Sequence, residues 1–95
     1  MKEENSFLKR LEAVHTFPGS YMFKVIGVNT EKFVLQVVQA ATLATKGGEK
    51  LSLKTKESTA GRHVSVTLTA DVEDAEMVLE VYRLLQTVDD VHFIA

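Results

Sequence analysis

The chain contains no cysteine, and this absence excludes disulfide bonds, thiolate metal sites and thiol catalysis. It also lacks any apolar run that approaches the ~20 residues needed by a membrane-spanning helix. The first five residues do not have the basic-then-apolar order of a signal peptide. The 11 basic and 13 acidic residues leave a net charge of only −2, so no overall field draws the protein to nucleic acid or to an anionic membrane. We therefore expect a soluble, cytoplasmic protein.

What the sequence does contain is a regular series of periodic segments within 95 residues, enough for one domain with one hydrophobic core. Apolar and polar residues alternate, as in half-buried strands. The expected strands are residues 20–28, 51–56, 63–70 and 88–95, and the alternation is cleanest in 63–70. Between the first two lies a helical segment that begins at a cap at Asn29 or Thr30, and Gly47-Gly48 is expected to stop it. A second helical segment, between the last two strands, is expected to be capped by Asp71.

A short amphipathic helix precedes these segments, over residues 6–15, with Ser6 as its expected N-cap. We expect residues 1–16 to form an N-terminal helical extension and residues 17–95 to form the main domain. Packing on its own body is the simplest way for this helix to bury its apolar side chains. Covering the open sheet face, swapping between protomers and binding a partner are the alternatives.

The order strand, helix, strand, strand, helix, strand predicts an α+β fold, the ferredoxin-like βαββαβ sandwich. Right-handed crossovers place both helices on one face of a four-stranded antiparallel sheet. The expected strand order is fourth, first, third, second. One face of the sheet is then left uncovered, and function would have to reside there.

We expect the uncovered face to be mixed, mildly basic and only partly apolar. Its expected side chains are Met22, Lys24, Ile26, Lys54, Lys56, His63, Ser65, Thr67, His92 and Ile94. The aromatic side chains of Tyr21, Phe23 and Phe93 are expected to point toward the helices instead. An antiparallel sheet can leave such a face solvated, and otherwise the face is a dimer contact or a docking surface.

Two groups of residues are the candidates for binding a ligand or partner. The first lies on the open sheet face and consists of Lys24, Lys54, Lys56 and His63. The second is the turn formed by Ser58, Gly61 and Arg62, in which Gly61 suits a positive φ.

Other chemistries fit these residues less well. His63 and Ser65 share a face but sit about 6–7 Å apart along one strand, with no third group to orient a catalytic base. His63 and His92 are expected roughly 10 Å apart, and a metal site needs three or four ligands. RNA-binding sheets of this topology stack bases on open-face aromatics, which are expected here to point inward. We therefore predict no catalytic residue, no metal and no cofactor.

Several short segments resemble the YbeD-like proteins, a family of small bacterial proteins of unknown function. Phe17-Pro18 followed by Phe23-Lys24-Val25-Ile26-Gly27 resembles the opening of the family. Its Ser-rich turn, third strand and second helix are matched at Ser58, Gly61, Ser65-Val66, Tyr82 and Leu85. The resemblance covers residues 17–95. The chain departs from the pattern at Ala60, where Lys is common, and at His63, where Tyr is usual.

The resemblance implies a ferredoxin-like fold similar to the ACT regulatory domains, which bind amino acids at subunit interfaces. It implies no reaction, since the family has no established activity and a fold does not by itself define a function. We predict a small non-enzymatic regulatory or protein-interaction domain. The alternatives are an ACT-like sensor of an amino acid or metabolite at a homodimer interface, and RNA binding. The expected partner is an unknown protein or a small metabolite, and neither a membrane nor nucleic acid is expected.

Overall fold

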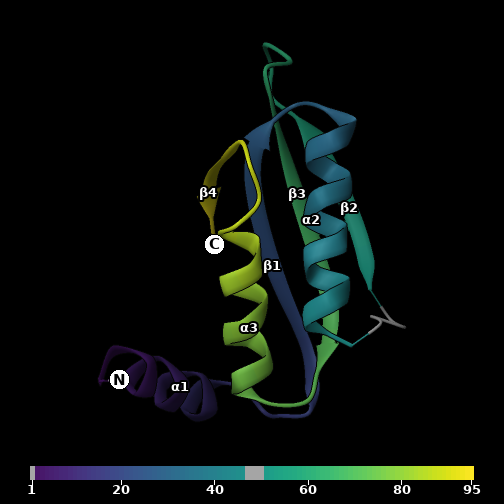
Figure 1. Ribbon diagram of the computed structural model, residues 1–95. Helices are drawn as coiled ribbons and strands as arrows, with labels where there is room; N and C mark the ends of the chain where they lie inside the picture. The colour runs from purple at the N-terminus through teal and green to yellow at the C-terminus, as the bar shows by residue number, and fades with distance from the viewer. Residues whose placement is uncertain (1, 47–50) are drawn as a thin grey trace.

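The computed structural model describes residues 2–46 and 51–95, which form three helices and one four-stranded antiparallel sheet (Figure 1). The elements follow in the order α1 (Lys2–Val14), β1 (Gly19–Val28), α2 (Glu31–Ala44), β2 (Ser52–Glu57), β3 (His63–Val72), α3 (Ala75–Leu85) and β4 (Val91–Ile94). The strand order in the sheet is β2-β3-β1-β4. Both the ferredoxin-like α+β fold and the strand order predicted from the sequence are therefore confirmed.

The long strands β1 and β3 form the centre of the sheet and pair along their whole length, from Gly19 opposite Val72 to Val28 opposite His63. Alternate residues of β3 are buried, as the period-2 pattern predicts. Strand β2 pairs with the outer side of β3, and β4 pairs with the outer side of β1. The sheet therefore has two edges, β2 and β4.

The hydrophobic core lies between the sheet and the helices α2 and α3, which both cover the same face (Figure 1). Its largest fully buried side chains include Phe23, Phe33, Leu68 and Leu85. Burying each contributes about 1.5–3 kcal/mol. Helix α2 begins at Thr30, whose Oγ1 accepts a hydrogen bond from the Phe33 N–H at 3.1 Å, so Thr30 is the cap of the two expected candidates.

Helix α3 begins three residues later than predicted. Its N-cap is Asp74, whose Oδ1 accepts a hydrogen bond from the Met77 N–H at 2.8 Å, and the prediction of Asp71 as the cap is wrong. Strand β3 continues through Val72, which is buried and pairs with Gly19. Because Val72 fills an inward position of the sheet, the chain turns into the helix only after it.

Helix α1 packs against α3, so the prediction that it packs on its own body is confirmed. The helix begins at Lys2, and the prediction of Ser6 as its N-cap is wrong because Ser6 lies inside the helix. Leu11 is buried, and the Phe7 ring meets the Tyr82 ring edge-on at a centroid distance of 5.9 Å. The Nη2 of Arg83 donates to the Oε1 of Glu4 at 2.7 Å. This hydrogen bond, with the positive charge of Arg83, lowers the pKa of the Glu4 carboxyl.

Gly27 lies where β1 passes close to α2 and to the turn before β4. A Cβ at Gly27 would overlap the ring of Phe33 and the carbonyl oxygen of Asp90. The pairing of β1 with β4 also shifts register between Ile26 and Gly27. The helix stop predicted at Gly47-Gly48 lies outside the described residues. Within the described residues, no helix has the length and apolar character that crossing a bilayer requires.

Candidate functional site: the open face of the sheet

The face of the sheet opposite α2 and α3, called the open face below, carries the outward side chains of the strands. The register places the following residues on it: Met22, Lys24, Ile26, Ser52, Lys54, Lys56, His63, Ser65, Thr67, Thr69 and Phe93. Helices α2 and α3 leave this face uncovered (Figure 1). The positions that the sequence predicts for β1, β2 and β3 are those observed.

Three lysines form a positively charged triangle on the open face. Lys24 on β1 and Lys54 on β2 both lie opposite Thr67 of the intervening strand β3, about 10 Å apart by two strand spacings. Lys56 lies two residues further along β2, about 7 Å from Lys54. All three are exposed, and none takes part in a salt bridge within residues 2–46 and 51–95. Asp71 lies at the far end of the same face, opposite Ser20.

Four of the predicted binding residues line one hollow of about 280 Å³ near the β2–β3 hairpin. They are Lys24, Lys56, Ser58 and His63. Ile26 and Ser65 form the floor of the hollow. Glu57 also borders it, although Glu57 pairs with Val64 and its side chain therefore lies on the helix side of the sheet. Lys54 does not line the hollow, because it lies one row further along the sheet.

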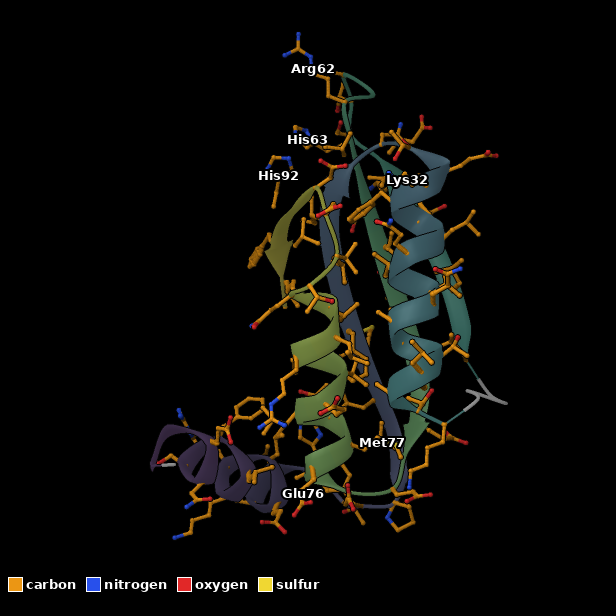
Figure 2. The ribbon with its side chains drawn as sticks, in the orientation of Figure 1. Lys32, Arg62, His63, Glu76, Met77 and His92 are labelled. Carbon is orange, nitrogen blue, oxygen red and sulfur yellow. The ribbon has the colours of Figure 1, made fainter. Side chains whose placement is uncertain are left out.

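The hairpin turn, the second candidate, is fixed by hydrogen bonds. Gly61 has a φ of 74°, as its predicted role in the turn requires. The side-chain Nδ2 of Asn29 donates to the Gly61 carbonyl oxygen at 3.0 Å, and the Asn29 backbone N–H donates to the Arg62 carbonyl oxygen at 3.1 Å. The turn is thereby tied to the loop between β1 and α2. Figure 2 shows the Arg62 side chain projecting from the hairpin tip, away from the hollow.

His63 and His92 are in contact, although two strand spacings predict that they lie apart. Their ring centroids lie 4.9 Å apart in an edge-to-face arrangement (Figure 2), so the expected separation of roughly 10 Å is wrong. The backbones do belong to strands on either side of β1, but the register shift near Gly27 brings His92 toward His63, and the rings meet over β1. Within the described residues, no group of three or more His, Cys, Asp or Glu side chains could hold a metal ion.

The last strand presents the opposite faces from those expected for two residues. Phe93 lies opposite Ile26 on the open face and is 51% exposed, whereas Ile94 lies opposite Val25 and packs against the core. The prediction that Ile94 faces outward and Phe93 inward is therefore wrong. The physical reason is a β-bulge. Strand β4 carries one extra residue between the pairs Ile26–Phe93 and Gly27–Val91, so the side chains after the bulge point to the opposite faces from those that a regular alternation along the strand predicts.

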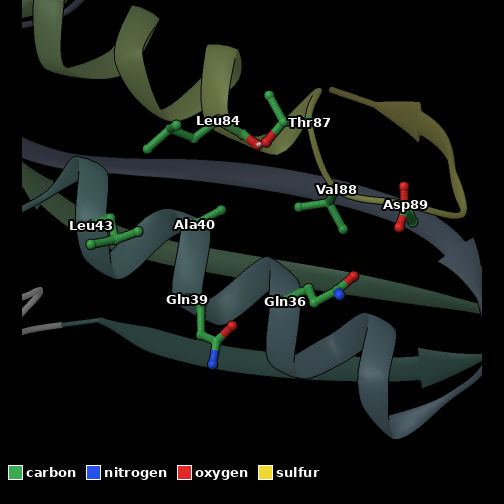
Figure 3. A pocket seen from close by; sticks show the side chains of 8 residues that line it. All are labelled: Gln36, Gln39, Ala40, Leu43, Leu84, Thr87, Val88 and Asp89. Atoms are coloured by element: carbon green, nitrogen blue, oxygen red, sulfur yellow. Dashed lines mark hydrogen bonds between the residues drawn. The ribbon is translucent and has the colours of Figure 1, made fainter.

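Residues 2–46 and 51–95 line three further hollows on the helix side of the sheet. One, of about 390 Å³, separates the start of α2 from strand β2 and is lined by Asn29, Thr30, Glu31, Val34, Leu35, Thr55, Glu57 and Val64. A second, of about 240 Å³, lies between α2 and the segment after α3, where its polar side chains are Gln36, Gln39, Thr87 and Asp89 (Figure 3). The third, of about 350 Å³, lies between α1, α3 and β4.

A cluster of aromatic rings adjoins the third hollow. The Tyr82 ring contacts the rings of Phe7, Tyr21 and Phe23, and its hydroxyl lies 3.4 Å from the hydroxyl of Tyr21. Burial, together with the Tyr21 hydrogen bond, raises the pKa of the Tyr82 phenol well above its ordinary value. Tyr82 is therefore a neutral, half-buried packing residue rather than an ionised group.

The order of the elements and the strand order of the sheet define a small ferredoxin-like α+β domain. The ACT domain of the GTP pyrophosphokinase of Chlorobium tepidum superimposes with a TM-score of 0.59 at 9% identity, covering 80% of this chain and 94% of that one. The solution structure of protein HP0495 from Helicobacter pylori gives a TM-score of 0.66 at 16% identity and covers 86% of each chain. At these identities the likeness establishes the fold alone.

The chain belongs to the DUF493 family of proteins of unknown function, whose model matches residues 12–95. A UPF0250 protein of Idiomarina loihiensis is 28% identical over 85 residues, which cover 90% of this chain and 94% of that protein. These matches confirm the resemblance to YbeD-like proteins. Most of α1 precedes the segment that the family model matches.

Proposed function

We propose that this protein is a small, non-enzymatic regulatory domain that binds an acidic, extended segment of a partner protein on its open face. The observation that carries the proposal is the lysine triangle of Lys24, Lys54 and Lys56, which has no acidic partner in a salt bridge among the described residues. An exposed cluster of one charge attracts ligands of the other charge and favours their association.

The spacing of the lysines favours an extended peptide. Alternate residues of a strand lie about 7 Å apart on one face, which is also the spacing of Lys54 and Lys56 along β2. An acidic residue at every second position of a bound segment would therefore meet one lysine after another. Lys24, about 10 Å across the sheet, is placed to meet a carboxylate from the other side of the same segment.

The remaining groups on the face give less support to catalysis or to RNA binding. The Ser58 Oγ accepts a hydrogen bond from the backbone N–H of His63 at 3.2 Å, and no hydrogen bond joins it to an imidazole base among the described residues. Tyr21 and Phe23 point to the helix side, and the Phe, Tyr or Trp ring that the described residues place on the open face is that of Phe93, on the short strand β4. Base stacking on such sheets uses two or three aromatic positions.

A fluorescent ten-residue oligoglutamate peptide is the probe that tests this proposal. Fluorescence anisotropy at low ionic strength should show binding that weakens as salt is added. Each exposed charge pair is worth about 0.2–1 kcal/mol, so Lys24→Ala with Lys54→Ala should weaken binding by about 2-fold to 30-fold. The matched control is Lys9→Ala with Lys32→Ala, which removes the same charge from α1 and α2 and should leave the affinity unchanged.

Equal weakening by the two double variants would show that only net charge matters and would exclude the open face as the site. Circular dichroism must show that both variants melt near the wild-type temperature, as expected for exposed side chains. Binding of mixed-sequence RNA in preference to oligoglutamate would exclude an acidic partner.

A second candidate function is an ACT-like sensor of an amino acid or similar metabolite. The observation in its favour is the 390 Å³ hollow beside the edge strand β2, where the polar groups of Asn29, Thr30 and Glu31 gather at the start of α2. Thermal unfolding against a panel of amino acids and nucleotides tests it. A ligand at a hundred times its Kd adds ~2.7 kcal/mol and should raise the midpoint by roughly 10–20 °C. A flat panel would exclude a sensor for those ligands.

A further inference from the structure

The two edges of the sheet differ in their chemistry. All six residues of β2 are exposed, and three of them, Lys54, Lys56 and Glu57, are charged. The other edge, residues 91–95, contains Val91, His92, Phe93, Ile94 and Ala95 and has no lysine, arginine or acidic residue. Charged residues, lysine above all, are the usual protection of an edge strand against pairing with another chain. Strand β2 is protected in this way and β4 is not.

Self-pairing is unfavourable at the β2 edge. If two copies of β2 paired in antiparallel fashion about Thr55, each Lys54 would lie directly opposite the second copy's Lys56, and this contact would occur twice. Like charges that face each other across strands are destabilising. A second copy of the chain is therefore repelled at β2.

The backbone of β4 is available for pairing. Ala95 exchanges both of its backbone hydrogen bonds with Lys24, at 2.9 and 2.7 Å. Because consecutive residues in an antiparallel pair direct their N–H and C=O groups to opposite sides, those of Ile94 point to the free edge. An added strand would satisfy these groups.

Apolar side chains flank the β4 edge on both faces of the sheet. On the open face, Phe93 is 51% exposed. On the helix side, Ile94 and Ala95 line the 350 Å³ hollow together with Phe7, Leu79 and Tyr82. Figure 1 shows that α1 and β4 lie on the same side of β1, and Phe7 of α1 belongs to the lining of this hollow. A strand added here would need apolar residues on both of its faces.

Strand β4 itself meets this requirement, since Phe93 lies on one face and Val91 and Ile94 lie on the other. We propose that the β4 edge is a self-association surface, at which two copies of the chain pair their β4 strands about a two-fold axis. Such an isologous contact uses the same patch twice, places the two Phe93 rings near the axis and brings the two α3 helices together on the other face. This inference does not depend on the acidic partner proposed above.

The oligomeric state of the full chain is the first test. Light scattering during size-exclusion chromatography should give a mass that rises toward twice the 10.6 kDa of the chain as the concentration increases. Phe93→Lys should return the protein to monomer, because it places a charge near the axis. The matched control is Leu43→Lys, which changes an apolar residue of 73% exposure on α2 and should leave the dimer intact. A wild-type chain that stays monomeric at millimolar concentration would overturn the proposal and leave the edge to a strand of another protein.

Disulfide cross-linking distinguishes the two edges directly. Because the chain has no native cysteine, each single-cysteine variant can cross-link only through the introduced residue. Phe93→Cys should form a disulfide-linked dimer under mild oxidation, because residues at the axis of an antiparallel pair have Cα atoms within disulfide reach. Thr55→Cys, at the middle of β2, should not. Faster cross-linking of Thr55→Cys, or equal rates for the two variants, would refute pairing through β4.

Discussion

Replacing Gly27 by alanine tests how closely β1, α2 and the turn before β4 pack together. The new methyl group would overlap the ring of Phe33, which is fully buried, and the carbonyl oxygen of Asp90. Neither neighbour can move freely, because the ring lies in the core and the Asp90 oxygen accepts the backbone N–H of Val28 at 3.2 Å. The variant should therefore fold with a shifted helix or a displaced turn.

The expected loss of stability follows from two opposing contributions. Overpacking a filled site costs about 1–3 kcal/mol. Alanine also restricts the unfolded chain, which returns about 0.4–1 kcal/mol where the native backbone conformation suits it. Because both overlapped groups are held in place, the overpacking cost should lie at the upper end of its range, about 3 kcal/mol. The net free energy of unfolding should then fall by about 2–2.6 kcal/mol, which corresponds to a melting midpoint lower by roughly 8–21 °C.

A double-mutant cycle with Phe33→Leu, followed by circular dichroism during thermal unfolding, checks the cause. Shortening the ring should relieve part of the overlap, so the two substitutions should couple by at least ~0.5 kcal/mol. The control is Gly61→Ala, where the strain comes from a φ of 74° and no atom lies within 4 Å, so it should add independently to Phe33→Leu. A Gly27→Ala variant as stable as the wild type would refute the close approach.

Three further predictions concern the helices and the aromatic cluster. Asp74→Ala removes the hydrogen bond to the Met77 N–H and should cost about 1 kcal/mol, seen as a midpoint lower by roughly 4–8 °C; an unchanged midpoint would argue against Asp74 as the cap. The lowered pKa of Glu4 means that its bond to Arg83 stabilises the fold above the ordinary carboxyl value of 4.5 and is lost as the pH falls further. Melting of wild type and Glu4→Gln should therefore differ at pH 7 and converge in acid, and a constant difference would contradict this linkage. For Tyr82 the pKa is raised, so the neutral phenol stabilises the folded state fully below the ordinary value of 10.0, and this stability is lost at higher pH. The melting temperature of Tyr82→Phe should therefore fall less in alkali than that of the wild type. Equal sensitivity of the two would show that the buried phenol does not control alkaline unfolding.

The fold could be predicted because its long elements repeat one pattern many times. Strand β3 alternates over ten residues, and the order of strands and helices leaves few right-handed topologies. The start of α3 was missed because two aspartates precede it and either can cap a helix. The inward position of Val72, which continues the alternation of β3, is the signal that favours Asp74.

The candidate site could be predicted only in part. Lys24, Lys54, Lys56 and His63 lie on the expected face, because their strands keep a strict period of two. The contact of His63 with His92 and the exposure of Phe93 could not be foreseen, since both depend on a one-residue bulge in a strand of four residues. So short a segment has too few positions for its alternation to fix which side is buried.

The place of β1 at the centre of the sheet has a consequence for how the protein is made. Strand β1 is synthesised before its first strand partner, β3, which is complete only at Val72, about 44 residues after the end of β1. At 5–20 residues per second, this delay lasts roughly 2–9 seconds. During that time both edges of β1 are unpaired, and Phe23 and Val25 have no sheet to join. The apolar side chains of β1 therefore stay without a sheet partner for longer than in a fold whose first two strands form a hairpin.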